Sequence, residues 1–435
     1  MGGGMWYDRG MDAKGKAQWG AFWGLVLIQS VNSLNEKGVQ FLLIALGIWM
    51  STMLQYPLSV LIVLPFVLFS PVAGWLADRY SKTKLLQGMV LLQVVALAGM
   101  AAGLFLHHLP TAVGFFTVFC VQAMFFSPAK KGLVKDMVGT QHIGFASGIL
   151  EISSMLALLV GQIGALWLVY HLLESWGEAA GWEAAAWPCV ACMAAAVVVY
   201  LVSLRLPKYP PLGTRPFTQA LFVKHFSQLK LLWNDRVLRM SQVGIGYFWF
   251  IGGVMILIAL QMAQEAQGGE AESGSVHFLQ VLGQQKDSAM LMAWISGGSV
   301  LGGVLSSVLC AGRIRTCIAL YGGVGISLSC FALVFLPYGS WMFYAALALA
   351  GMTAAGYLVP LNALLQDHAD DDKRGDVIAA GNLVDCGLGI MSVAIQGGMR
   401  ALGLSTQMQC GALALSAIIV TAYLGVNMKK GVFNE

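Results

Sequence analysis

The sequence predicts an all-α polytopic membrane protein that crosses the bilayer twelve times, and three observations support this. Of the 435 residues, 58% are hydrophobic and 11% are charged, with a mean hydropathy of +0.73, whereas soluble domains carry about 25% charged residues. Apolar runs of about 20 residues, long enough to cross a hydrocarbon core of about 30 Å, recur along the whole chain. The runs are continuous rather than alternating, which favours helices over a β-barrel.

The apolar runs place the twelve transmembrane helices in order along the chain. Their expected ranges are 20–47, 54–77, 85–106, 110–129, 144–170, 184–204, 240–263, 288–311, 316–336, 340–366, 376–399 and 404–428. Because twelve is an even number, we expect both termini on the same side of the membrane.

The distribution of lysine and arginine tests this topology. Of the 25 basic residues, 22 fall in the termini and loops on the side of the N-terminus. Lys286 and Arg400 fall on the other side, whose loops are acidic, and Lys37 lies within an expected helix. Basic loops stay in the cytoplasm, so we expect both termini to be cytoplasmic.

The longest basic-side connection divides the chain into two halves. It follows the sixth expected helix and begins with four prolines: Pro207, Pro210, Pro211 and Pro216. We expect an N-terminal six-helix bundle at 1–205, a cytoplasmic linker at 206–239 and a C-terminal six-helix bundle at 240–435. Two pseudo-symmetric halves with a site between them at mid-membrane are typical of secondary transporters.

Composition and motifs argue against several other function classes. The basic residues sit in short loops and form no stripe interleaved with aromatics, so we expect no nucleic-acid partner. The pair Cys189 and Cys192 lies inside an expected helix, and the run 370–372 of aspartates fits a solvated loop better than a metal site. The chain has no H-x-x-x-x-D, H-E-x-x-H or G-x-S-x-G pattern, and we expect neither an enzyme nor a cofactor.

Four ionisable residues fall well inside expected helices: Glu36, Lys37, Glu151 and Asp385. An ionised group in the bilayer costs several kcal/mol unless it is paired or hydrated, so such residues are functional candidates. Lys130 adds a fifth charge at the end of the fourth helix, after Pro128. The alternative is that these charges form structural ion pairs that never meet a ligand.

The loop after the second expected helix carries a recognisable motif. It reads Gly74-Trp-Leu-Ala-Asp78-Arg79-Tyr-Ser81-Lys82-Thr-Lys84 and resembles the corresponding loop of the major facilitator superfamily, with Ser81 where glycine is usual. The resemblance implies two six-helix bundles that work by alternating access, with helices 1, 4, 7 and 10 lining the cavity. It also implies a conformational latch in which the glycine lets helices 2 and 11 approach, the carboxylate binds a helix end and the basic residues pair across the halves.

Other stretches resemble the bacterial lysophospholipid transporter family. They are Phe126-Ser-Pro-Ala-Lys-Lys-Gly132, Gly148-Ile-Leu-Glu-Ile-Ser-Ser154, Val359-Pro-Leu-Asn-Ala-Leu-Leu-Gln366 and Gly381-Asn-Leu-Val-Asp385. The resemblance implies a flippase that moves lysophospholipids from the outer to the inner leaflet of the bacterial inner membrane. It also implies membrane lipids as surroundings and a cytoplasmic-face acyltransferase as a functional partner.

Helix 1 departs from that family, whose members tend to show F-N-D-N-x-x-K. Here the stretch is Leu34-Asn-Glu-Lys-Gly-Val-Gln40, so the carboxylate is one carbon longer and the cation lies three residues earlier, on the same helical face. A lysophosphatidylethanolamine head group needs a cation for its phosphate, Lys37 or Lys130, and a carboxylate for its amine, Glu36 or Asp385. The candidate substrate residues are Asn35, Glu36, Lys37, Lys130, Glu151, Asn362 and Asp385.

Two alternatives remain open at this level. A proton-coupled exporter of drugs or small metabolites would use Glu36 or Asp385 as its proton carrier. A non-transporting membrane anchor for an acyltransferase would need neither a latch nor charges at the midplane. Asn362 and Gln366 could bind substrate or cap the end of helix 10, and Glu151 could pair with Lys130 or Lys131.

Overall fold

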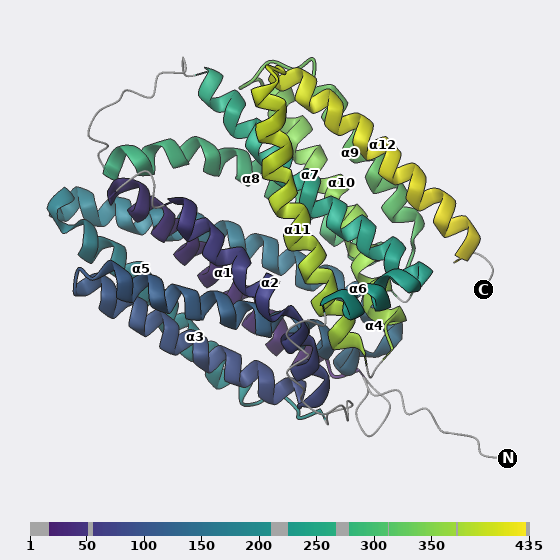
Figure 1. Cartoon of the computed structure of the whole chain (residues 1–435), viewed down its shortest axis with the longest axis horizontal. Helices are drawn as coiled ribbons and strands as arrows, with labels where there is room; N and C mark the ends of the chain where they lie inside the picture. Colours follow the sequence, from purple (N-terminus) through teal and green to yellow (C-terminus); the bar gives the residue numbers. More distant parts are fainter. Residues whose placement is uncertain are drawn as a thin grey trace.

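The protein is built from helices that pack as two groups side by side (Figure 1). The computed structural model describes residues 17–50, 55–209, 225–266, 278–311, 313–370 and 373–431. By length and apolar composition alone, seven helices of this described part could cross a membrane, and one of them is the 68-residue α4.

The first group contains the N-terminal helices. Their bounds are α1 (Trp19–Met50), α2 (Gln55–Arg79), α3 (Lys82–Phe105), α4 (Leu109–Trp176), a short 3₁₀ helix (Glu178–Ala180) and α5 (Gly181–Ser203).

Helix α4 holds two of the expected transmembrane helices. At Gly139 the backbone leaves helical geometry, with φ 70° and ψ 176°, a left-handed conformation that glycine adopts without the steric cost of a Cβ. The segments before and after it both reach the middle of α1. Cys120 lines the same pocket as Glu36, and the Gly161 carbonyl lies against Gly38. Gly139 therefore joins two passes beside the same partner.

The second group contains the C-terminal helices. They are α7 (Arg236–Ala266), α8 (Phe278–Leu309), α9 (Cys317–Leu333), α10 (Trp341–His368), α11 (Arg374–Ala401) and α12 (Thr406–Gly431). With α4 counted as two passes, the described helices give the predicted all-α architecture of twelve crossings arranged as six plus six. Within the expected linker lies a further ten-residue helix, α6 (His225–Asn234), which the apolar pattern did not predict.

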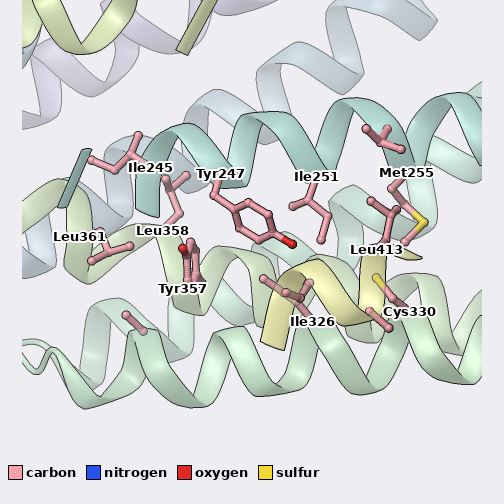
Figure 2. Packing of buried hydrophobic residues seen from close by; sticks show 14 of the residues in the cluster. Ile245, Tyr247, Ile251, Met255, Ile326, Cys330, Tyr357, Leu358, Leu361 and Leu413 are labelled. Atoms are coloured by element: carbon pink, nitrogen blue, oxygen red, sulfur yellow. The ribbon is translucent and has the colours of Figure 1, made fainter. Parts of the chain in front are cut away.

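Each group has its own apolar interior. In the C-terminal group, Tyr247 and Ile251 of α7 face Ile326 of α9 and Tyr357 of α10 (Figure 2). The hydroxyl of Tyr247 forms a hydrogen bond with Ser416 Oγ at 2.7 Å, so its polar end has a partner. In the N-terminal group, α1, α3, α4 and α5 enclose two further clusters.

Large apolar side chains also cover the outside of the molecule. Trp167, Leu201, Phe335 and Leu415 are each more than half exposed. Exposed apolar surface on this scale is not tolerated in water, and it is the surface that a lipid-facing bundle presents.

Candidate functional site

The two helix groups are joined at one end of the bundle, which we name the basic end. It comprises the C-terminal ends of α2, α8 and α10, the Gly139 turn of α4 and the N-terminal end of α11. Basic residues of the helices that meet here include Lys82 of α3, Lys135 of α4 and Arg374 of α11.

Asp78 at the end of α2 caps the first turn of α11. Its Oδ1 accepts a hydrogen bond from the Gly375 amide at 2.8 Å and its Oδ2 accepts one from the Asp376 amide at 3.3 Å. The first amides of a helix have no partners within the helix, and the positive end of the helix dipole attracts a carboxylate. The contact therefore ties the N-terminal group to the C-terminal group.

Small residues let α2 and α11 approach to backbone contact. A Cβ placed on Gly74 would lie 2.9 Å from the Asp376 Cα and 2.9 Å from the Gly375 carbonyl oxygen. One turn earlier in α2, Ser70 Oγ donates to the Ala379 carbonyl at 2.6 Å. These contacts close the basic end along this pair of helices.

Asp136 accepts hydrogen bonds from a base of each helix group. Lys82 of α3 donates to its Oδ2 at 2.6 Å, and Arg374 of α11 reaches its Oδ1 at 3.5 Å. The Lys82 side chain is 7% exposed and that of Arg374 is 1% exposed, so the charges are shielded from solvent. The other two basic residues of the predicted latch, Arg79 and Lys84, lie on the exposed surface.

Further polar contacts join α4 to the C-terminal group above this layer. Asn382 of α11 donates to Ser127 Oγ at 2.9 Å, and Asn362 of α10 donates to Glu151 Oε1 at 3.2 Å. Lys135 donates to the Asp367 carbonyl at 2.8 Å. Glu151 therefore bonds across the groups rather than to a lysine, and Asn362 faces it.

The linker helix α6 also takes part in the basic end. The side chain of Gln228 donates to Asp376 Oδ1 at 2.8 Å and lies 3.4 Å from the Pro71 carbonyl of α2. Gln228 thus touches both helices of the Asp78 contact. A lone glutamine in a polar loop gives no sequence signal for this role.

A pocket opens on the other side of this closed layer, inside the N-terminal group. It is a small cavity of about 10 Å³, room for about one water molecule, between α1, α2 and the first segment of α4. Its polar lining is Glu36 and Gln40, and its apolar lining consists of Ile62, Phe66, Phe116, Phe119, Cys120 and Ala123. Glu36 lies 17 residues into α1, roughly 26 Å from Trp19, which is near mid-membrane.

The neighbours of Glu36 on α1 point in different directions. Lys37 donates to Gln40 Oε1 at 2.7 Å, at the rim of the pocket. Asn35 is fully buried and donates to the Cys192 carbonyl of α5 at 3.1 Å. The structure therefore places Asn35 away from the pocket, between two helices.

Half-buried charges in this central region lack an ion-pair partner among the residues that the structure describes: Glu36, Lys37, Lys130, Lys131, Glu151 and Asp385. Lys130 lies 5.7 Å from the centre of the Phe126 ring and interacts electrostatically with Glu36 and Glu151 without bonding to either. Asp385 differs, because it accepts a hydrogen bond from Gln242 of α7 at 2.7 Å. The described part of this centre thus holds both lysines and carboxylates that no ion pair neutralises.

The comparisons with known proteins define the class of this protein. The Major Facilitator Superfamily model matches residues 21–393, so the chain belongs to this superfamily of transporters. Among solved structures, FucP in the outward conformation has a TM-score of 0.70 at 12% identity, covering 93% of this chain and 98% of that one. A bacterial homologue of the iron transporter ferroportin, in its outward-facing state, has a TM-score of 0.66 at 13% identity, covering 93% and 99%.

Curated relatives narrow the class. The chain is similar to the lysophospholipid transporter LplT of Salmonella newport (strain SL254), with 28% identity over 360 residues and 80% of each chain covered. It is 25% identical over 368 residues to LplT of Enterobacter sp. (strain 638), with 82% of each chain covered. The resemblance to bacterial lysophospholipid transporters, first drawn from short motifs, is thereby confirmed.

The sequence predicts Glu36, Lys37, Lys130, Glu151 and Asp385 as candidate site residues because charge inside an apolar run is conspicuous. It missed Asp136, Arg374, Gln228 and the aromatic wall of the pocket. Asp136 did have a signal in the sequence, since this carboxylate directly follows a basic stretch that contains Lys130, Lys131 and Lys135. The phenylalanines had none, because they are ordinary residues of a membrane helix.

Proposed function

We propose that this protein moves lysophospholipids from the outer to the inner leaflet of a bacterial inner membrane by alternating access. The observation that carries the proposal is that two half-buried charges, Lys130 and Glu36, lack ion-pair partners among the described residues and interact electrostatically with each other. A zwitterionic head group complements both charges at once. The curated relatives, which are named lysophospholipid transporters, support the same substrate class.

The proposed direction of transport follows from the orientation of the chain in the membrane. The basic loops favour the cytoplasm for the basic end and for both termini. With that orientation the closed layer around Asp78 separates the site from the cytoplasm, and the pocket at Glu36 belongs to the outward-accessible part. A product delivered to the inner leaflet would meet an acyltransferase that works at the cytoplasmic face.

The charges suggest how the substrate could be held and released. The phosphate binds Lys130, with Lys37 as a second cation once it leaves Gln40, and the amine binds Glu36. Glu151 interacts electrostatically with Lys130 and accepts a hydrogen bond from Asn362 of the other half, so a bound phosphate would disturb a contact that keeps the basic end closed. Opening then requires Asp78 to leave the amides of α11, as in a two-state interface.

A leaflet-resolved assay tests this function. Purified protein is placed in liposomes with fluorescent lysophospholipid in the outer leaflet, and protection from an impermeant quencher reports inward movement. We expect protection to rise faster than in protein-free liposomes and faster than for a diacyl lipid with the same head group. Equal rates with and without protein would refute the proposal.

One observation favours a second candidate, a proton-coupled exporter. Asp385 is a half-buried carboxylate on α11 whose recorded partner is the neutral amide of Gln242 at 2.7 Å. A carboxylate held by an amide rather than by a base is able to take up and release a proton. Transport that stops when the proton gradient is collapsed by an ionophore, and that fails with lysolipids, would favour the exporter.

A further inference from the structure

The linker helix α6 depends on the surface against which it packs, because a helix of ten residues is marginal by itself in water. Gln228 and Leu232 lie four positions apart, hence on one face, and are 5% and 0% exposed. Lys230 and Trp233 lie on the exposed surface. α6 packs on α7 and on the N-terminal end of α11, and it reaches α2 through Gln228 (Figure 1). The linker therefore ends in a docked helix at the basic end.

The side chain of Gln228 is a hydrogen-bond donor at the place where α2 meets α11. Its Nε2 donates to Asp376 Oδ1 at 2.8 Å and lies 3.4 Å from the Pro71 carbonyl oxygen. Both neighbours are acceptors, so only the NH₂ group of the amide can face them. The amide oxygen is buried and has no hydrogen-bond partner among the described residues, which is unfavourable. Packing alone would therefore favour an apolar residue at this position.

Asp376 connects Gln228 to the Asp78 contact. Its backbone amide donates to Asp78 Oδ2 at 3.3 Å, while its carboxylate accepts the bond from Gln228. The two carboxylates interact electrostatically, and like charges at one helix end repel each other. A donor directed at Asp376 Oδ1 stabilises that anion, so it reduces the cost of bringing Asp78 to the same helix end.

We propose that α6 controls the opening of the basic end, with Gln228 as a positioning residue that holds the Asp376 carboxylate while Asp78 binds the first turn of α11. When α6 is docked, the Asp78 contact is favoured, and when Gln228 is withdrawn, the contact is weakened. The linker is then a regulatory element of the conformational cycle as well as a tether. The inference rests on the alternating access of the proposed function and not on its substrate.

The competing explanation is that α6 only covers the end of the C-terminal bundle. In that case Gln228→Leu would leave the basic end closed or close it further, because it removes an unpaired buried acceptor and adds apolar packing. The positioning role predicts the opposite direction, since leucine cannot donate to Asp376.

The test measures the ratio of closed to open molecules in purified full-length protein without substrate. Spin labels at the exposed positions Lys84 and Arg313, one in each half, report the distance across the basic end in a Cys317→Ser background. The closed population gives the shorter distance. Each variant is also checked by its melting temperature in detergent.

Four variants are compared with the unmodified protein: Gln228→Leu, Asp376→Asn, the double variant, and Lys230→Leu as the matched control on the exposed face of α6. We expect Gln228→Leu to lower the closed-to-open ratio by about tenfold, as loss of a hydrogen bond to a charged group implies. In the Asp376→Asn background the same substitution should lower the ratio by about twofold or less, because the second anion is absent. Lys230→Leu should leave the ratio unchanged.

A fifth variant, Gln228→Glu, keeps the shape of the side chain and places a third carboxylate beside Asp376. It should lower the ratio at least as far as Gln228→Leu, and it replaces that variant in the test if the leucine protein does not fold.

Two results would overturn the role of Gln228. One is an unchanged or raised closed-to-open ratio in Gln228→Leu or Gln228→Glu, and the other is an equal effect of Gln228→Leu with aspartate and with asparagine at position 376. Failure of the proposed function looks different, because the label distances would then respond as expected while the unmodified protein moved no lysophospholipid in the leaflet-resolved assay.

Discussion

The Asp78 carboxylate lies across two free amides in the first turn of α11, with Oδ1 2.8 Å from the Gly375 nitrogen and Oδ2 3.3 Å from that of Asp376. One side chain from the end of α2 thus caps a helix that begins at Arg374, and the bonded residues Asp78 and Gly375 are 297 positions apart in the sequence. Since the two helices belong to different halves, the bond exists only when the basic end is closed. The bond therefore stabilises one conformation of the protein and not the fold of either bundle by itself.

Replacing Asp78 with asparagine should shift the protein away from this closed conformation. The variant keeps the size of the side chain but loses the charge that favours the helix N-terminus, an effect of about 1–2 kcal/mol in a buried setting. We expect the ratio of closed to open molecules to fall about fivefold to thirtyfold. Distances between spin labels at the exposed positions Lys84 and Arg313, in a Cys317→Ser background, report the two populations.

The matched control for this variant is Asp370→Asn, which removes an exposed carboxylate at the same end of the molecule. Its side chain is 68% exposed and pairs with Lys373 at the surface, so we expect no change in the label distances. If Asp78→Asn gave the same distance distribution as the unmodified protein, the latch role of Asp78 would be wrong.

Adding a methyl group at Gly74 should prevent full closure of the basic end. The new Cβ would meet the Asp376 Cα and the Gly375 carbonyl at 2.9 Å, and backbone atoms cannot move aside as a flexible side chain can. We expect Gly74→Ala to fold, to show a larger Lys84–Arg313 label distance and to transport at least about tenfold more slowly.

Gly88→Ala serves as the control for Gly74→Ala, because nothing lies within 4 Å of a Cβ at Gly88. In a helix this change should be neutral or slightly stabilising. A normal transport rate in Gly74→Ala would show that the observed approach of α2 and α11 is not needed for the transport cycle.

The shared carboxylate of Asp136 should matter more for stability than either of its bases. Asp136→Asn removes the carboxylate that two buried cations, Lys82 and Arg374, share, whereas Lys82→Met leaves Asp136 with Arg374. Breaking a buried charge pair costs about 3–5 kcal/mol, so we expect the larger fall in melting temperature for Asp136→Asn, measured in detergent. Lys84→Met, on the exposed surface two residues after Lys82, should leave the melting temperature unchanged.

The test is which of the two substitutions lowers the melting temperature more. If Lys82→Met lowered the melting temperature as much as Asp136→Asn, then Arg374 would contribute little to holding Asp136, and the charge cluster would be a simple pair within the N-terminal half.

Removing either central cation should slow the movement of lysophospholipid. A hydrogen bond to a charged group contributes about 1.5–3 kcal/mol, so Lys130→Gln should reduce the rate at low substrate by about tenfold or more. We also expect Lys37→Ala to abolish uptake while the protein stays folded, as judged by its elution and melting temperature. Lys208→Ala, outside the membrane-spanning helices, is the control.

A transport rate equal to that of the unmodified protein would remove the substituted lysine from the substrate site. Different results for the two lysines would be informative, because Lys130 has no ion pair in the described structure and Lys37 is held by Gln40. Loss in Lys130→Gln alone would assign the phosphate to Lys130.

The sequence predicts the charged residues of the candidate site but not their partners. Glu36 and Lys130 were identifiable because ionised groups inside apolar helices are rare and costly. Asn35 shared that short segment, yet it bonds to α5, because each step of about 100° along a helix turns a side chain to a different neighbour. The Gly139 turn lies between two expected helices, but its geometry depends on a backbone angle that no apolar pattern encodes.

The sequence by itself determined the number of membrane crossings, the basic side of the bundle and the ionisable groups held within it. These are local properties, since hydropathy over about 20 residues decides whether a segment stays in lipid. The tertiary structure decided that Asp78 meets Gly375, that Asp136 serves both halves and that phenylalanines of α2 and α4 surround Glu36. Such contacts join segments tens to hundreds of residues apart, and they depend on which face each helix presents once the two bundles have packed.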